Sequence, residues 1–396
     1  MVDPGAFTPF YDDALCRALA AEACDVRLVT APFVYHPWPE AVGYARRELF
    51  AGGAGVARAG RLPERALRRV YRVLSYPLAW RKLVGELARR PPAIVHLQWS
   101  LLPAVERRAL RRLRAAGVKV VQTVHNPRPH GGERTIPPAG ARLRSEADAL
   151  VVLSEAGRET IVADRLAPAS RVRVIPAGIA ASGAIGGGGG GTGAGGEVGR
   201  GPARARLGLE AGAPVALFLG LIRPYKGLDL LLPAFAEVQR ALPAARLVVA
   251  GLPRPSFRPY ARQIERLGLG ERVRTDLRYL PQTAMDDYLA AADLVVLPYR
   301  DASQSGVLGA ALALDRPVVA SATGGIPEML AESAGEMLVP AGDVAALAGA
   351  MTRLLADRDR AAALGRRAGE AARARFSWSR CAASTAALYR ELTERS

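Results

Sequence analysis

The stretch Gly220-Leu-Ile-Arg-Pro-Tyr-Lys-Gly227 decides how this chain of 396 residues folds and what it binds. It follows the apolar run 214–219, which is typical of a buried strand, and it precedes the helix-like segment 228–235. Two glycines, an arginine and a lysine therefore stand where open α/β sheets bind ligands, at the carboxyl end of a strand. A helix N-terminus flanked by Arg223 and Lys226 favours a diphosphate. The alternative is an ordinary strand–helix turn whose cations are merely solvated.

The composition is basic, with a formal net charge of +17 and a pI of about 10.6. The length predicts two domains, and no apolar run approaches the ~20 residues that a membrane span needs. The charge favours acidic partners such as phosphorylated substrates, anionic lipid or nucleic acid. No nucleic-acid recognition module is visible, so we expect no nucleic-acid partner.

Cysteine usage and the first residues bear on the compartment. Cys16, Cys24 and Cys381 have no metal-ligand spacing, and an odd number of cysteines in a large chain favours reduced thiols. No basic region followed by an apolar core, the pattern of a secretory signal, opens the chain. We therefore expect a cytoplasmic protein that holds no metal.

The first half alternates helices with strands, which predicts a parallel sheet covered on both faces. The opening, Met1-Val-Asp-Pro-Gly5, resembles the end of a strand, so we expect a truncated first strand; a short edge strand is the alternative. Further strands are expected at 26–30, 93–97, 118–124, 150–153 and 172–175, with helices at 12–23, 63–90 and 107–116.

A glycine-rich segment, 183–201, separates this half from a second α/β half. We expect a first domain at 1–182, a flexible linker at 183–201 and a second domain at 202–375. A terminal helix at 376–396 is expected to pack back on the first domain. Strands of the second domain are expected at 215–219, 245–250, 273–279, 294–297 and 317–320.

The second half carries a series of motifs that are weak singly and specific in this order. They are FLGLIRPYKGLDLLLPAF (218–235), LVVAG (247–251), RYLP (278–281), DDYLAAADLVVLPYR (286–300), SQSGVLGAALALDRPVVASATGGIPEML (303–330) and GEMLVPAGD (335–343). With them the chain resembles family 4 glycosyltransferases, retaining nucleotide-sugar enzymes of the GT-B fold. The resemblance implies an α/β architecture of two doubly wound Rossmann-like domains facing a central cleft.

The resemblance also implies a donor site in the second domain. Family members neutralise the leaving nucleoside diphosphate with an arginine and a lysine, usually five residues apart, but Leu221 holds that arginine position here. We expect Arg223 to substitute; otherwise Lys226 works alone. Small residues at a helix start, after the strand 294–297, would expose N–H groups to phosphate, or Ser305 would be an ordinary helix cap. The expected diphosphate-binding residues are Gly220, Arg223, Lys226, Gly227, Ser305 and Gly306.

A departure from the family concerns two glutamates that usually stand eight positions apart around this helix start. The first position falls on Ser303 and the second on Ala310 or Ala311, so neither acid is present. Asp301 is the nearest carboxylate, and we take His125, Asp301 and Ser303 as catalytic candidates in a variant subfamily. Donor sugar or ribose contacts are expected from Gly324, Gly325 and Glu328, although Glu328 fits equally well as an acid that stabilises a helix N-terminus.

The acceptor side is expected in the first domain. His125 and Asn126 follow the strand 118–124, and in the family a histidine there approaches the donor sugar; the alternative is a buried structural histidine. His130 and the loop residues Gly5 and Thr8 are further acceptor-side candidates. His96 is interpreted as structural.

The resemblance suggests partners and leaves rivals. We expect a nucleotide-sugar donor, a glycan, glycolipid or metabolite acceptor, and no cofactor. The arginine-rich segments 58–90 and 107–114 fit either peripheral contact with anionic membrane at the inner face of the cell membrane or solvated helix faces. The missing glutamates motivate a non-catalytic nucleotide-sugar-binding relative as the alternative function. A nicotinamide-dependent enzyme is disfavoured because no G-x-G-x-x-G fingerprint stands between a first strand and helix.

Overall fold

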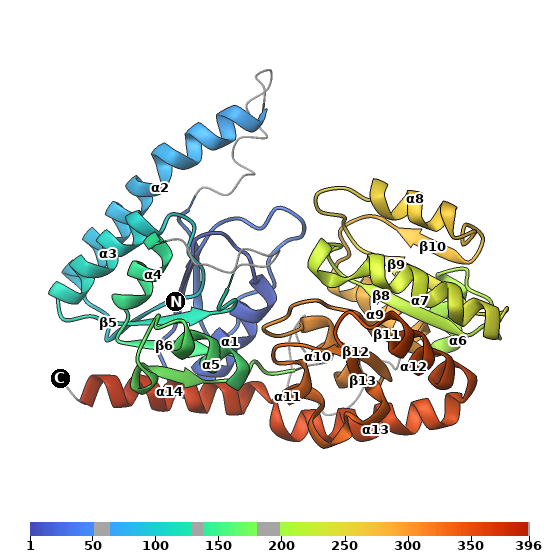
Figure 1. Cartoon of the computed structure of the whole chain (residues 1–396). Helices are drawn as coiled ribbons and strands as arrows, with labels where there is room; N and C mark the ends of the chain where they lie inside the picture. Colours follow the sequence, from blue (N-terminus) through green and yellow to red (C-terminus); the bar gives the residue numbers. More distant parts are fainter. Residues whose placement is uncertain (51–63, 129–137, 180–198, 395–396) are drawn as a thin grey trace. The chain divides into compact units, whose positions relative to one another are not determined.

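The computed structural model in Figure 1 describes residues 1–50, 64–128, 138–179 and 199–394. Two compact units make up the chain: unit 1 combines Met1–Gly178 with Trp378–Ser396, and unit 2 is Ile179–Ser377. Most of the expected linker 183–201 lies outside the described residues. Helix α6 (Arg200–Arg206) begins inside that range, so its last two residues are helical.

Unit 1 contains one parallel sheet with the strand order β3-β2-β1-β4-β5-β6-β7. Its strands are β1 (Val2–Asp3), β2 (Arg27–Thr30), β3 (Ala45–Glu48), β4 (Ile94–Leu97), β5 (Lys119–Val124), β6 (Ala149–Val152) and β7 (Val172–Val174). Its helices are α1 (Pro9–Ala21), α2 (Glu64–Arg89), α3 (Pro103–Ala115), α4 (Pro138–Ser145), α5 (Glu155–Ala163) and α14 (Trp378–Glu394). Helices α1 and α3 start earlier than expected because Pro9 and Pro103 suit the first turn of a helix.

The sheet of unit 1 is buried on both faces, as its strand sequences predict. Leu28 and Val121 pack with side chains of α1 and α14, whereas their chain neighbours Val29 and Val120 pack with side chains of α2 and α3. This alternation follows from the two-residue period of a strand. Helix α14 thus covers one face of the unit 1 sheet, although it comes last in the sequence.

The short first strand occupies the interior of the sheet. Val2 pairs with Val29 of β2 and with Leu97 of β4. The edge-strand alternative is therefore wrong. The two edge strands are β3 and β7. Sequence analysis missed β3 because its residues Ala-Arg-Arg-Glu lack the apolar pattern of a strand.

Unit 2 contains a second parallel sheet with the order β10-β9-β8-β11-β12-β13. Its strands are β8 (Val215–Leu219), β9 (Arg246–Ala250), β10 (Val273–Asp276), β11 (Leu294–Leu297), β12 (Val318–Ala322) and β13 (Leu338–Pro340). Its longer helices are α7 (Leu228–Ala241), α8 (Arg258–Arg266), α9 (Gln282–Ala291), α10 (Gly306–Ala313), α12 (Val344–Ala356) and α13 (Arg358–Arg375), and α11 (Ile326–Leu330) is a single turn. Strand β10 ends three residues before the expected Tyr279.

The two sheets share one topology. In each, the first strand lies between the second and the fourth, so the strand order reverses beside the first strand. Open α/β sheets bind ligands at the carboxyl ends of the strands at such a reversal. We call loops 4–8 and 98–102, after β1 and β4, the unit 1 switch point. Loops 220–227 and 298–305, after β8 and β11, are the unit 2 switch point.

No helix in the described ranges is long and apolar enough to span a membrane.

Candidate active site

The two loops of the unit 2 switch point are bonded to one another. The backbone N–H of Arg300 donates to the carbonyl oxygen of Tyr225 at 2.8 Å. The Arg300 guanidinium also forms a two-pronged ion pair with Asp229 at the start of α7, at 2.7 and 2.6 Å. These bonds fix the loop after β8 against the loop after β11.

Two glycines allow the loops to approach this closely. Gly227 has φ +70°, and a Cβ added there would lie 1.9 Å from the carbonyl oxygen of Pro298. Gly324, after β12, has φ +51°, and its added Cβ would lie 1.4 Å from the carbonyl oxygen of Ala302. Only glycine fits both the positive φ and the missing space. The loops after β8, β11 and β12 therefore form one connected surface.

The cations of the opening motif lie on this surface. Lys226 is half-buried, and its ammonium stands 5.3 Å from the centre of the Tyr299 ring. A Cβ added to Gly220 would lie 3.3 Å from the Lys226 Nζ, so Gly220 leaves room beside that ammonium. Burial, together with the nearby charge of Arg223, lowers the pKa of Lys226.

Arg223 is exposed and directly precedes the short 3-10 helix that contains Lys226. Among the described residues, neither Arg223 nor Lys226 forms an ion pair. Two neighbouring cations without a counter-charge repel each other, and a bound anion would remove that repulsion. The arrangement fits the expected diphosphate site.

Two helix N-termini open at the same switch point. Ser305 caps α10, with its Oγ accepting a hydrogen bond from the N–H of Leu308 at 3.2 Å, while Gly306 begins the helix and is exposed. Helix α7 begins after Gly227 without any side-chain cap. Uncapped N–H groups and the helix dipole favour a bound anion there.

The remaining donor-side candidates lie on the loops after β11 and β12. Asp301 and Ser303 are half-buried in the first loop, and Gly325 donates its N–H to the carbonyl oxygen of Ala302 at 3.3 Å. Glu328 is half-buried in the first turn of α11. The structure thus brings these four residues to the same connected surface as Lys226, and their contacts with a sugar stay a prediction.

His125 lies at the carboxyl end of β5 in unit 1, next to the unit 1 switch point. Its imidazole is buried, stacks on Trp99 with a centroid distance of 4.6 Å, and donates from Nε2 to Gln98 Oε1 at 3.1 Å. Burial lowers the pKa of His125 to about 3, so the ring is neutral at pH 7. The Gln98 side chain is thus one polar partner of the ring, and both the expected catalytic role and the structural alternative stay predictions.

The other acceptor-side candidates surround this histidine in part. Thr8 Oγ1 accepts from the indole N–H of Trp99 at 2.8 Å, and the N–H of Gly5 donates to Asp3 Oδ1 at 3.1 Å. Asn126 is half-buried beside His125, and its carbonyl oxygen accepts from Arg144 at 3.2 Å. His130 lies outside the described residues.

Sequence analysis missed the two residues that hold His125, which are Gln98 and Trp99. Both directly follow β4, so their position after a strand end, in the run His96-Leu-Gln-Trp99, was the available signal. Tyr299 was missed as well, although it directly follows β11 and so offered the same signal. Among the described residues, no group of three or more histidine, cysteine, aspartate or glutamate side chains could hold a metal ion.

His96, interpreted as structural from the sequence, and Asp293 both join elements of the scaffold. His96 bonds Tyr389 of α14 through Nδ1 at 2.6 Å and Thr123 of β5 through Nε2 at 2.7 Å. Asp293 accepts from the N–H of Val215 at 2.8 Å and pairs with the buried Arg204 at 2.6 Å. Both residues therefore tie elements of the scaffold together.

Comparison with known protein families finds two matching domains. Residues 13–182 match the family described as Glycosyltransferase Family 4, and residues 213–357 match the family described as Glycosyl transferases group 1. The matched ranges cover most of unit 1 and most of unit 2, respectively.

The curated relatives that match this chain are also named glycosyltransferases. The chain is 39% identical over 191 residues to the D-inositol 3-phosphate glycosyltransferase of Segniliparus rotundus, which is 48% of this chain and 42% of that protein. It is 32% identical over 263 residues to the protein of the same name from Kineococcus radiotolerans, and this match covers 63% of this chain and 58% of that protein. The chain thus spans about half the length of the curated relatives it matches.

Solved structures share the fold along nearly the whole chain. Sucrose-phosphate synthase from Thermosynechococcus elongatus superposes with a TM-score of 0.75 at 23% identity, covering 98% of this chain and 93% of that one. The Anabaena protein HepE in complex with UDP gives 0.70 at 17% identity, covering 98% of both chains. The two parallel sheets with flanking helices are the GT-B fold, and the chain belongs to the glycosyltransferases, with a family 4 domain in its first half and a group 1 domain in its second.

Proposed function

We propose that the protein is a retaining glycosyltransferase, which moves a sugar from a nucleotide-diphosphate sugar to an acceptor hydroxyl. The observation that carries this proposal is the pair Arg223 and Lys226 at the unit 2 switch point. Both are cations without an acidic partner among the described residues, beside the N-termini of α7 and α10. That combination suits a nucleoside diphosphate.

In the proposed reaction the bond between the sugar C1 and the diphosphate oxygen breaks, and a bond from C1 to the acceptor oxygen forms. The acceptor hydroxyl loses its proton to the departing diphosphate, which also takes the bonding electrons. Negative charge therefore grows on the diphosphate, and fixed cations stabilise that charge most in the transition state. Lys226 and Arg223 supply this stabilisation, so the proposal requires no metal ion.

The donor sugar is proposed to contact Asp301, Ser303, Gly324, Gly325 and Glu328, which share the connected surface with Lys226. His125 of unit 1 is proposed as a further catalytic residue that acts as a neutral hydrogen-bonding group. HepE was solved with UDP, and UDP is therefore the first donor nucleotide to test here.

Sugar transfer from a nucleotide-sugar donor to an acceptor tests the proposal. Purified protein is incubated with UDP-, GDP- and ADP-sugars and an extract that contains acceptors, and sugar transfer is followed by mass spectrometry. We expect transfer from one donor class and its loss in Lys226→Ala. Binding of a nucleoside diphosphate without transfer from any donor would favour the alternative, a non-catalytic nucleotide-sugar-binding relative.

We further propose that unit 1 contacts anionic membrane at the inner face of the cell membrane. The support is a surface groove of about 630 Å³ between α3 and α4, lined by five arginines. Its lining residues are Ala104, Arg107, Arg108, Arg111, Arg112, Ala115, Ala139 and Arg142.

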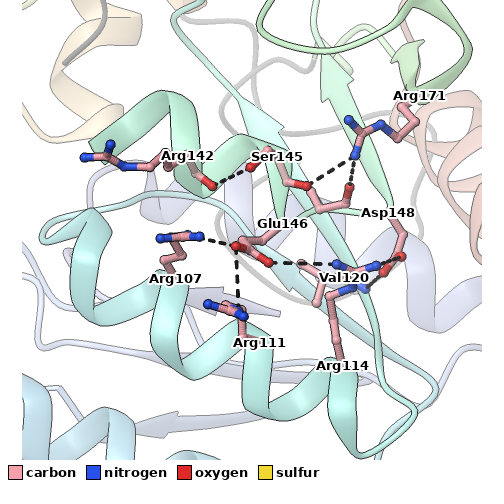
Figure 2. Close-up of polar contacts among 10 residues, drawn as sticks. Arg107, Arg111, Arg114, Val120, Arg142, Ser145, Glu146, Asp148 and Arg171 are labelled. Atoms are coloured by element: carbon pink, nitrogen blue, oxygen red, sulfur yellow. Dashed lines mark hydrogen bonds and ion pairs between the residues drawn. The ribbon is translucent and has the colours of Figure 1, made fainter. Parts of the chain in front are cut away.

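The acidic residues beside this groove neutralise only part of it. Figure 2 shows Glu146 between Arg107, at 2.8 Å, and Arg111, at 4.0 Å. Arg114 pairs with Asp148 at 3.1 Å. Arg108, Arg112 and Arg142 have no acidic partner among the described residues. Juxtamembrane cations of this kind each contribute about 1 kcal/mol toward anionic lipid.

Vesicle sedimentation at low and high salt tests the membrane proposal. We expect binding to vesicles with phosphatidylglycerol at low salt, weakened roughly tenfold or more in the triple variant of Arg108, Arg112 and Arg142 to alanine. The matched control replaces Arg258, Arg262 and Arg266, three exposed arginines of α8 in unit 2. If both triple variants lost vesicle binding equally, net charge alone would explain the binding and the proposal would be wrong.

A further inference from the structure

The loops at the carboxyl edge of unit 1 present an unusual set of exposed aromatic side chains. Phe7 follows β1 and is 52% exposed, and Val34 and Tyr35 follow β2 and are 53% and 42% exposed. Phe10, Phe33 and Trp99 are half-buried among them. Strands β2, β1 and β4 are neighbours in the sheet, so their loops share one edge. We call these six side chains, which are five aromatic rings and Val34, the aromatic platform.

The rings of the platform contact one another in two groups. Phe7 lies against Trp99 at 5.2 Å between centroids, and Trp99 in turn stacks on His125. Phe33 lies edge-on to Phe10 at 6.4 Å and to Tyr35 at 5.6 Å. The first group connects the platform directly to His125, which we propose as a catalytic residue.

Buried carboxylates hold the loops of the platform. Asp3 accepts the N–H groups of Gly5, at 3.1 Å, and Phe7, at 2.8 Å. Glu106 accepts the N–H groups of Leu101, at 2.6 Å, and Leu102, at 3.2 Å. A surface that is already ordered binds a ligand without a further loss of conformational entropy.

The platform carries no charge. Charged residues make up 23% of the chain, yet segments 4–11, 31–39 and 98–105 contain no lysine, arginine, aspartate or glutamate. Phosphate is bound most strongly through charge-assisted hydrogen bonds from arginine and lysine, and these three segments supply neither residue. Exposed apolar surface at a ligand edge instead favours a ligand with an apolar face.

We propose that the aromatic platform binds the acceptor, and that the acceptor is an uncharged molecule with an apolar ring or chain beside its reacting hydroxyl. This inference rests on the proposed function. It separates the chain from the curated relatives, which are named for an inositol that carries a phosphate. The hydroxyl of the acceptor reaches the neighbourhood of His125 while its apolar part lies on Phe7, Trp99 and Tyr35.

The test compares three acceptor probes by saturation-transfer NMR and titration calorimetry: phenyl β-D-glucoside, methyl β-D-glucoside and D-myo-inositol 3-phosphate. We expect the phenyl glucoside to bind about tenfold more tightly than the methyl glucoside, because its ring buries apolar area on the platform. Phe7→Ala and, separately, Tyr35→Ala should each remove most of that difference. Leu78→Ala, which truncates a 63% exposed leucine on α2, is the matched control.

Each outcome decides the inference. Equal binding of the two glucosides, tightest binding of the inositol phosphate, or equal effects of Phe7→Ala and Leu78→Ala would overturn it. Circular dichroism of each variant shows whether it folds. If Phe7→Ala does not fold, Tyr35→Ala still tests the inference. UDP binding is measured in the same samples. If UDP binds and the phenyl ring does not strengthen glucoside binding, the inference on the acceptor fails while the proposed function stands. If the wild type binds no nucleotide, the proposed function itself fails.

Discussion

The two switch points have the same topology and opposite chemistry. In unit 2 the loops after the first and fourth strands contain two cations without acidic partners among the described residues, together with glycines at positive φ. In unit 1 the corresponding loops contain aromatic rings, a neutral histidine beside them and no charged residue within 4–8 or 98–102. The shared sheet order sets where a ligand binds, and the loop residues set which ligand.

The comparison also shows two ways of ordering a loop. Unit 2 uses glycines that allow backbone to touch backbone, as at Gly227 and Gly324. Unit 1 uses buried carboxylates that accept backbone N–H groups, at Asp3 and Glu106. Unit 2 also joins its loops through the ion pair between Arg300 and Asp229, in which the guanidinium balances the charge of the carboxylate.

Removing the central cation of unit 2 should have the largest effect. Lys226→Ala should lower kcat/KM by about 100-fold or more, because the ammonium stabilises charge that develops on the leaving diphosphate. Lys82→Ala, which removes an exposed lysine from unit 1, is the charge-matched control and should change kcat/KM little. A similar loss of kcat/KM in Lys226→Ala and Lys82→Ala would contradict the assignment of the diphosphate to unit 2.

A side chain added at a glycine of the unit 2 loops should lower the free energy of unfolding. Gly227→Ala should destabilise the protein by about 1–3 kcal/mol, since its φ is +70° and its Cβ would meet Pro298. Gly270→Ala is the matched control, because nothing lies within 4 Å of its added Cβ. Chemical denaturation measures both; a neutral Gly227→Ala would contradict the described loop contact.

The neutral histidine of unit 1 predicts a pH dependence. Burial lowers the pKa of His125 to about 3 in the folded state, against an unfolded value near 6.5. The folded state then binds fewer protons than the unfolded state between these values, so stability is complete above pH 6.5 and falls as the pH drops toward 3. Each pH unit in that window costs roughly 1.4 kcal/mol for this one group.

His125→Phe keeps an aromatic ring on Trp99 and cannot titrate. The free energy of unfolding should therefore fall less steeply with acid in this variant than in the wild type, and denaturation between pH 6.5 and 4 measures the difference. Parallel pH profiles would show that His125 is not held neutral by burial, and the described environment of the ring would be wrong.

Most of the fold could be predicted from sequence, and the reasons are physical. Strands such as Val215–Leu219 and Leu294–Leu297 are buried on both faces, so they read as continuous apolar runs. Strand β3 could not be found, because an edge strand of Ala-Arg-Arg-Glu lacks any such run. The edge alternative for the short β1 stayed open at the sequence level, because two residues do not reveal their pairing partners.

The candidate site divides in the same way. The positions of Lys226, Gly227 and Ser305 followed from strand ends and a recognisable turn, which are local features. The partners of His125 did not, because Gln98 lies 27 residues away along the chain and meets it only when β4 pairs with β5. The aromatic platform is also invisible locally, since its rings come from three separate loops and the first turn of α1.

The most direct test of the central claim, that unit 2 holds the diphosphate and unit 1 the uncharged acceptor, is calorimetric titration of UDP, GDP and ADP into three proteins. The wild type should bind at least one of the nucleotides, Lys226→Ala should bind it at least tenfold more weakly, because a charge-assisted contact is lost, and Phe7→Ala should bind it unchanged. Absence of nucleotide binding by the wild type, or equal weakening in Lys226→Ala and Phe7→Ala, would contradict the account.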